Sequence, residues 1–268
     1  MRLAVPLLLA FLFVAPVAQA QGLLGYSVTY DAKPLKEDKA VYLEGQASST
    51  LSRTCQEWSF GEIFQLAIDR KNPGGKITVK SERIEDKVSA QESLDGTVLK
   101  YQTRLRHDAR IDTATGTASL GKDPGQLQAV LSRSSQDSAL PAGTLAPAAA
   151  RAALLEALAA NKPGPIEIHT VEMLRFHKPV KQVFTRLVPG DPSIARDLPK
   201  DMKIPSKEFA AGKTWALRRQ VPAFNEFGDE FWLLHESGAI VREVVQRQDI
   251  KLLLEAREVS IFPPPSCP

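Results

Sequence analysis

Apolar and polar residues alternate along most of this chain, which is the pattern of β-strands that bury one face. Tyr26, Val28 and Tyr30 alternate with polar residues, and the segments around 58–68 and 99–106 repeat the pattern. Turn sequences such as Asp95-Gly96 and Ser237-Gly238 separate neighbouring segments. This arrangement predicts long antiparallel strands joined by hairpins.

Further strands are predicted at Ile166–Met173, Lys181–Leu187, Thr214–Val221 and Leu252–Phe262. About a dozen strands in total exceed what one flat sheet usually holds before it curls. The pattern therefore predicts a closed or partly closed antiparallel barrel, with a sandwich as the alternative. With no repeat at a fixed period, we expect residues 21–268 to form a single domain, in which the proline-rich stretch 188–214 is an excursion.

One alanine-rich segment departs from the strand pattern and predicts a helix over about 147–160. It follows a linker at 132–143, with Thr144 as a candidate cap, Pro147 in the first turn and Asn161 near the stop. Its leucines, Leu154, Leu155 and Leu158, form a narrow ridge. We expect this ridge to pack on the sheet; a helix that plugs or gates a barrel mouth is the alternative.

Residues 1–20 have the composition of a secretory signal peptide. Arg2 supplies a positive start, an apolar run follows, and Ala18-Gln19-Ala20 matches the small-x-small cleavage pattern. An uncleaved anchor is disfavoured because the apolar run is short and prolines interrupt it. We therefore expect cleavage after Ala20 and an exported, periplasmic product that does not span the membrane.

The chain has two cysteines, Cys55 and Cys267. An oxidising compartment lets disulfides persist, and two cysteines allow one intramolecular pairing. We therefore predict a Cys55–Cys267 disulfide with a structural role. Two unpaired buried thiols are the alternative.

Charge gives little information about function, because 34 Lys and Arg residues nearly balance 31 Asp and Glu residues. The basic residues are scattered, and the densest group, at 104–107, alternates with apolar positions. Nucleic-acid binding requires basic residues gathered on one face or element. We therefore expect no nucleic-acid partner.

The histidines do not form a convincing metal site. His169, Glu172 and His177 come nearest to one, but His169 and Glu172 differ by an odd number and should face opposite sides of a strand. Zinc needs three or four converging ligands. His107 and His235 stand beside hairpins and are expected to be exposed. We predict no metal and no cofactor.

A catalytic nucleophile is not evident either. Ser119 and Lys122 have the serine-x-x-lysine spacing, but that chemistry needs a helical turn, and the surrounding sequence predicts strand and turn. No catalytic residue is singled out, and a non-enzyme is favoured. An envelope hydrolase assembled from scattered residues stays open as an alternative.

Trp58, Phe60 and Phe64 are the aromatic residues nearest the first cysteine. They can simply fill a barrel core. Alternatively, a barrel of this size leaves a cavity for an apolar ligand or a partner segment, which these rings would face.

The order of several short motifs resembles the envelope integrity protein B (EipB) family of alphaproteobacterial periplasmic proteins. The resemblance runs over nearly the whole chain after the signal peptide. One departure is Leu187-Val188-Pro189-Gly190-Asp191, where family members tend to have an aromatic-acid-glycine turn. The resemblance rests on Gly25-Tyr26-Ser27-Val28-Thr29-Tyr30, Arg53-Thr54-Cys55-Gln56-Glu57-Trp58, Leu140-Pro141-Ala142-Gly143-Thr144, Ser237-Gly238-Ala239-Ile240 and Pro265-Ser266-Cys267.

The resemblance implies an open, spiral-like β-barrel with one helix against it, the same Cys55–Cys267 disulfide, no catalytic residues and a role in cell-envelope integrity. From it we expect a non-catalytic periplasmic protein that binds a protein partner or an envelope component. The alternative is a carrier of a lipid or lipoprotein acyl chain in an apolar barrel cavity.

Overall fold

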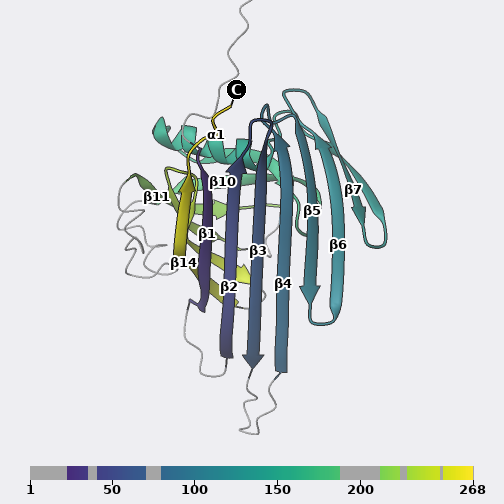
Figure 1. The fold of residues 1–268 in the computed structure, drawn as a ribbon, viewed down its shortest axis with the longest axis vertical. Coiled ribbons are helices and arrows are strands. Elements are labelled where there is room, and N and C mark those ends of the chain that lie inside the picture. The colour runs from purple at the N-terminus through teal and green to yellow at the C-terminus, as the bar shows by residue number, and fades with distance from the viewer. Residues whose placement is uncertain are drawn as a thin grey trace, which may run out of the picture.

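The computed structural model describes residues 23–35, 41–70, 80–187, 212–223, 228–247 and 250–267. Within them, fourteen antiparallel strands form one sheet and a single helix, α1 (Pro147–Ala159), lies across one end of it (Figure 1). The strands are β1 (Gly25–Pro34), β2 (Val41–Arg53), β3 (Glu57–Arg70), β4 (Lys80–Ser93), β5 (Val98–His107), β6 (Arg110–Ser119), β7 (Gly125–Leu131), β8 (Ser135–Leu140), β9 (Ile166–Glu172), β10 (Lys178–Arg186), β11 (Thr214–Gln220), β12 (Glu230–His235), β13 (Ile240–Arg247) and β14 (Ile250–Phe262).

The sheet order is β8-β7-β6-β5-β4-β3-β2-β1-β14-β13-β12-β11-β10-β9, so the first strand pairs with the last. The sheet curls, and β9–β13 lie behind β1–β4 in Figure 1. One buried cluster contains Val28, Ile68, Leu217 and Leu252, from strands on both sides of the curl. The expected open antiparallel barrel-like fold with one helix is confirmed.

The two edges of the sheet, β8 and β9, approach one another without forming a ladder. A single parallel bridge joins Leu145, just after β8, to Thr170 on β9. The Leu145 N–H donates to the His169 carbonyl at 2.8 Å, and the Thr170 hydroxyl donates to the Leu145 carbonyl at 2.9 Å. Side-chain bonds from Gln136 on β8 to the Phe176 and His177 carbonyls, 3.3 and 3.2 Å long, add to this contact. We call this junction the seam.

The disulfide joins Cys55 to Cys267 across 212 positions of sequence, with the Cα atoms 5.5 Å apart. Cys55 lies in the turn between β2 and β3, and Cys267 lies in the extended segment that follows β14. Because β14 pairs with β1 and β1 with β2, the bridge ties this segment back to a strand two positions away in the sheet.

Helix α1 begins at Pro147, whose missing N–H costs nothing in the first turn. Its N-cap is Ala146, which makes no side-chain cap bond, so the expected cap at Thr144 is wrong. The Thr144 hydroxyl instead donates to the Pro141 carbonyl. The predicted ridge of Leu154, Leu155 and Leu158 is buried. This helix is too short to cross a membrane, and no other helix occurs in the described residues.

Two further expectations differ from the structure. The segment 132–143 is not a linker, because it contains edge strand β8. His235 is buried and not exposed, since its Nδ1 atom pairs with the Ser237 hydroxyl at 2.9 Å inside the β12–β13 hairpin. His107 is exposed as expected. The predicted signal peptide and the stretch 188–211 lie outside the described residues.

Candidate functional site

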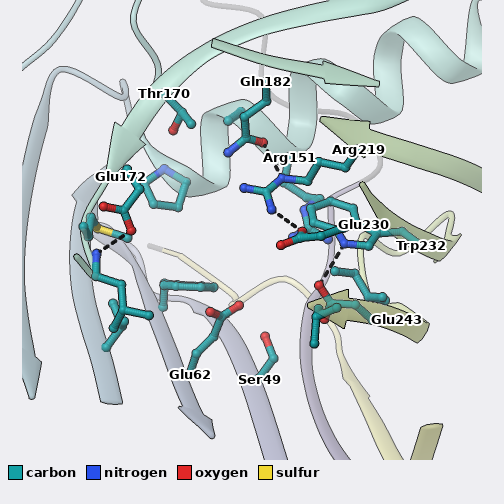
Figure 2. Close-up of a pocket in the computed structure, with 18 of the residues that line it drawn as sticks. Ser49, Glu62, Arg151, Thr170, Glu172, Gln182, Arg219, Glu230, Trp232 and Glu243 are labelled. Carbon is teal, nitrogen blue, oxygen red and sulfur yellow. Dashed lines mark hydrogen bonds and ion pairs between the residues drawn. The ribbon is translucent and has the colours of Figure 1, made fainter. Parts of the chain in front are cut away.

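The curled sheet encloses a cavity of about 280 Å³. Strands β1–β4 form one wall, β9–β14 form the other, and α1 closes one end (Figure 2). Small side chains on β2, Ala47 and Ser49, leave room for this space. Most of the lining is apolar and includes Phe60, Phe64, Leu154, Ile168, Phe184 and Val245.

The wall formed by β11–β13 carries a polar group of residues built from cross-strand pairs. Arg219 on β11 stands directly opposite Glu230 on β12, and Trp232 on β12 stands opposite Glu243 on β13. Arg219 makes an ion pair with Glu230, and its Nε donates to the Gln182 side-chain oxygen at 3.3 Å. Directly opposed positions on one face bring side chains into contact, so the strand register itself assembles this group.

Trp232 is the centre of this polar wall. Its indole N–H donates to the Glu243 carboxylate at 2.9 Å. The guanidinium carbons of Arg151 and Arg219 lie 4.9 and 5.2 Å from the ring centre, within the range of cation–π attraction. Burial opposes the charge on Arg219, but the carboxylates of Glu230, Glu243 and Glu62 together outweigh it and raise the pKa of Arg219. Both guanidinium groups are therefore held against the same indole ring.

Arg151 reaches the cavity from α1 and also donates to the Gly238 carbonyl in the β12–β13 hairpin at 2.8 Å. The start of the helix is fixed by Glu92 on β4, whose carboxylate accepts the N–H groups of Ala148 and Ala149 at 2.7 and 2.9 Å. Burial raises the pKa of Glu92 to about 7, although the two backbone bonds act in the opposite direction. The helix that closes the cavity is thus anchored to both walls.

Glu62 projects into the cavity from β3, across from Arg219 and Gln182 (Figure 2). It is exposed although it lines the cavity, so solvent reaches this space. Tyr26 and Tyr30 line the same region, and the Tyr30 hydroxyl donates to the Ile240 carbonyl at 2.7 Å. Burial raises the pKa of both tyrosines, so both hydroxyls stay protonated at neutral pH.

The residues considered as metal ligands have other roles. Both carboxylate oxygens of Glu172 accept backbone N–H groups of the following turn, at Leu174, Arg175 and Phe176. His177 is buried and its Nδ1 atom pairs with the Tyr101 hydroxyl at 3.2 Å. In the described part of the chain, no group of three or more His, Cys, Asp or Glu side chains is placed to hold a metal ion.

The three candidate aromatics on β3 separate in the structure. Phe60 and Phe64 line the cavity, whereas Trp58 is buried in the core and lies under the guanidinium of Arg53 at 5.7 Å. Ser119, which ends β6, accepts the N–H of Gln126 at 3.2 Å. The structure thus assigns Ser119 a place in the β6–β7 connection.

The charged cavity residues, Arg151, Arg219, Glu230 and Glu243, did not stand out in the sequence. Arg219 and Glu243 lie in strands that read as ordinary alternation with a charged outer face. One signal was available: Glu62 interrupts the apolar face formed by Trp58, Phe60, Phe64, Leu66 and Ile68. A carboxylate at an inward position of a strand points to a polar interior.

A scan against family models finds no match, and a search of curated proteins finds none. Among solved structures, the chain is similar to a beta-barrel-like protein of the domain of unknown function DUF1849 from Brucella abortus. The TM-score is 0.66 at 13% identity, covering 90% of this chain and 98% of that chain. This likeness shows a shared β-barrel-like fold, which is the fold that the resemblance to the EipB family implies.

Proposed function

We propose that this protein is a non-catalytic periplasmic protein that supports cell-envelope integrity by binding a protein partner or an envelope component. The observation that carries the proposal is the cavity inside the curled sheet, with apolar walls and a small fixed set of polar groups. Ligand sites in proteins typically combine an apolar lining with a few positioned polar side chains.

The polar groups of the cavity are suited to binding because they are held by one another. Arg219 is bonded to Glu230 and Gln182, and Trp232 to Glu243. Such a preorganised lining reduces the ordering that a ligand must impose when it binds.

A second candidate function is transport of a lipid or lipoprotein acyl chain. The apolar surfaces of Phe60, Phe64 and Leu154 favour it, because an aliphatic chain would remove them from water. The charged wall around Trp232 distinguishes this cavity from a purely apolar one, and is the reason for ranking the carrier second.

Native mass spectrometry on protein isolated from its own periplasm without detergent tests both functions. A stoichiometric second protein or a bound non-lipid envelope component supports the first, and an added mass in the lipid range supports the carrier. Finding neither would count against both. An intact mass equal to that of residues 21–268 would in addition support export with cleavage after Ala20.

A variant pair shows whether any co-isolated molecule occupies the cavity. Ala47→Phe places a ring into the space that Ala47 lines, so we expect the bound species to be lost. Gln46→Phe adds the same ring on the exposed face of the same strand and should retain it. Retention in both variants would place the binding site elsewhere.

A further inference from the structure

Two polar side chains from neighbouring strands lie side by side on the cavity wall. Gln182 on β10 and Arg219 on β11 both line the cavity, and the Arg219 Nε atom donates to the Gln182 side-chain oxygen at 3.3 Å. This bond assigns the orientation of the amide, because its oxygen faces the guanidinium and its NH2 group points elsewhere. Figure 2 shows both groups pointing into the space between the walls. The strand pairing thus holds two donor groups together at one place in the cavity.

Both side chains retain donors after their contacts within the wall. A guanidinium carries five N–H groups, and those of Arg219 bond to Gln182 through Nε and to Glu230 through Nη1. In the described residues, no acceptor is bonded to Nη2 of Arg219 or to the NH2 group of Gln182. The Arg219 side chain is 18% exposed although it lies inside the curled sheet. A ligand that enters the cavity can therefore reach these donors.

The surface around this pair is apolar. Val180 and Phe184 lie on either side of Gln182 along the inner face of β10, and Val221 follows Arg219 on the inner face of β11. A small polar site within an apolar surface is typical of pockets that bind a molecule with one polar group and an apolar body.

The charges around Arg219 disfavour an anionic ligand. Burial lowers the pKa of Arg219, and the carboxylates of Glu230, Glu243 and Glu62 together outweigh this effect, so all three act on the same guanidinium. A ligand that brought a further negative charge to this place would be repelled by the same carboxylates, and a space with low-dielectric walls strengthens such repulsion. An uncharged oxygen acceptor avoids this cost.

We propose that the cavity binds a neutral acyl ester or acyl amide, whose carbonyl oxygen accepts hydrogen bonds from Arg219 and Gln182 while its aliphatic chain lies against the apolar lining. A carbonyl oxygen has two lone pairs and can accept from both donors. The bond from the guanidinium is the stronger of the two, because its donor is charged. This inference rests on the proposed binding function and names the chemistry of its ligand.

Three probes with the same alkyl chain test the proposal: methyl octanoate, 1-methoxyoctane and octanoate. The first two differ only in a carbonyl group in place of a methylene group. Each is titrated calorimetrically into the protein comprising residues 21–268, at neutral pH and below the solubility limit of the probe. We expect methyl octanoate to bind about tenfold more tightly than 1-methoxyoctane, the effect of one hydrogen bond from a charged donor, and more tightly than octanoate. Octanoate binding as tightly as the ester would overturn the selection of a neutral ligand.

The variant Gln182→Met removes one donor and should reduce the preference for the ester over the ether by about fivefold, with the affinity for the ether unchanged. Gln182→Glu should reduce it as well, because the carboxylate keeps an acceptor for the Arg219 Nε atom but has no N–H group. This second variant decides the question if the methionine impairs folding. Gln102→Met, the same substitution on the exposed face of β5, is the control and should keep the full preference. An unchanged preference in both Gln182 variants would contradict the role given to this amide.

The outcomes separate this inference from the function it rests on. Equal binding of the ester and the ether would reject recognition of the carbonyl group and leave a cavity that binds apolar bodies. Binding of none of the three probes would overturn the inference, whereas a partner or envelope component found by co-isolation would still support the proposed function.

Discussion

Two junctions of this sheet are built very differently: the one in its middle, where the first strand meets the last, and the one where its two edges meet. At the first, β1 and β14 pair over Gly25–Pro34, and the disulfide adds a covalent link close by. At the second, the seam, β8 and β9 share no ladder: Leu145, just after β8, bridges to Thr170 on β9, and Gln136 on β8 bonds to the turn between β9 and β10. The barrel is therefore locked by a ladder and a disulfide at the first junction, and held at the second by a few backbone and side-chain hydrogen bonds and by an apolar cluster that includes Leu140, Val171 and Met173.

This difference indicates where the structure can open. A ladder distributes its stability over many cooperative bonds, whereas isolated contacts exchange with water one at a time. Helix α1 contributes to the weaker side, because its start is bonded to β4 and its body packs beside β9. The seam, with the helix across it, is the expected route into the cavity.

The largest effect is expected from removing the covalent link. Cys55→Ser, Cys267→Ser and the double variant should each lower the free energy of unfolding by about 2–5 kcal/mol, because a closed loop across 212 positions restricts the unfolded chain. Urea denaturation measures this. Wild-type protein kept reduced should match the double variant, and equal stability of oxidised and reduced protein would remove the locking role of the disulfide.

An intermediate effect is expected at the helix and depends on pH. Because burial raises the pKa of Glu92 to about 7, the folded state binds this proton more tightly than the unfolded state does. The stabilising contribution of Glu92 to the free energy of unfolding is present in full below about pH 4.5. It is lost as pH rises through about 7, a decrease of about 3 kcal/mol at most. Denaturation of wild type between pH 5 and 8 should show this decline.

Glu92→Gln should flatten that part of the profile, since the amide does not ionise and its oxygen can still accept a helix N–H. The control is Glu44→Gln, whose exposed carboxylate lies on β2. Profiles of wild type and Glu92→Gln that run parallel over this range would contradict the assignment.

The smallest effect is expected at the seam itself. Gln136→Ala removes two hydrogen bonds to backbone carbonyls and should cost about 1 kcal/mol. Gln128→Ala, exposed on β7, is the matched control. In hydrogen exchange, amides of β8 and β9 should exchange faster than those of β1 and β14. In Gln136→Ala, the exchange of the β8 and β9 amides should be faster than in wild type. Uniform protection of both junctions would refute the comparison.

Much of the fold could be predicted from the sequence, because a strand with a strongly apolar face shows a clear alternation of apolar and polar residues. Tyr26, Val28 and Tyr30 face inward as their alternation predicts, and the leucine ridge of α1 is buried. Strand β8 could not be predicted, because this edge strand has the sequence SQDSAL and therefore has no apolar face. In strand β2 the alternation of apolar and polar residues is weak, because its inward residues Ala47 and Ser49 are small. Their small size also leaves room for the cavity.

The candidate site was less predictable because it depends on register. The register of β11, β12 and β13 places Arg219 opposite Glu230 and Trp232 opposite Glu243. This register cannot be predicted from a single sequence. The cap of α1 was missed for a similar reason, since Glu92 is more than fifty positions upstream of the helix it caps. Long-range partners of this kind carry no local sequence pattern.

The pairing of β1 with β14 also has a consequence for the time course of folding. Gly25 lies beside Phe262, so the second neighbour of the first strand is the last strand to be synthesised. Contacts between such distant positions raise the contact order, and folding slows accordingly. We therefore expect a nascent chain to remain without its central strand pair until β14 is complete, and so to present an unpaired edge on β1 to chaperones for most of its synthesis.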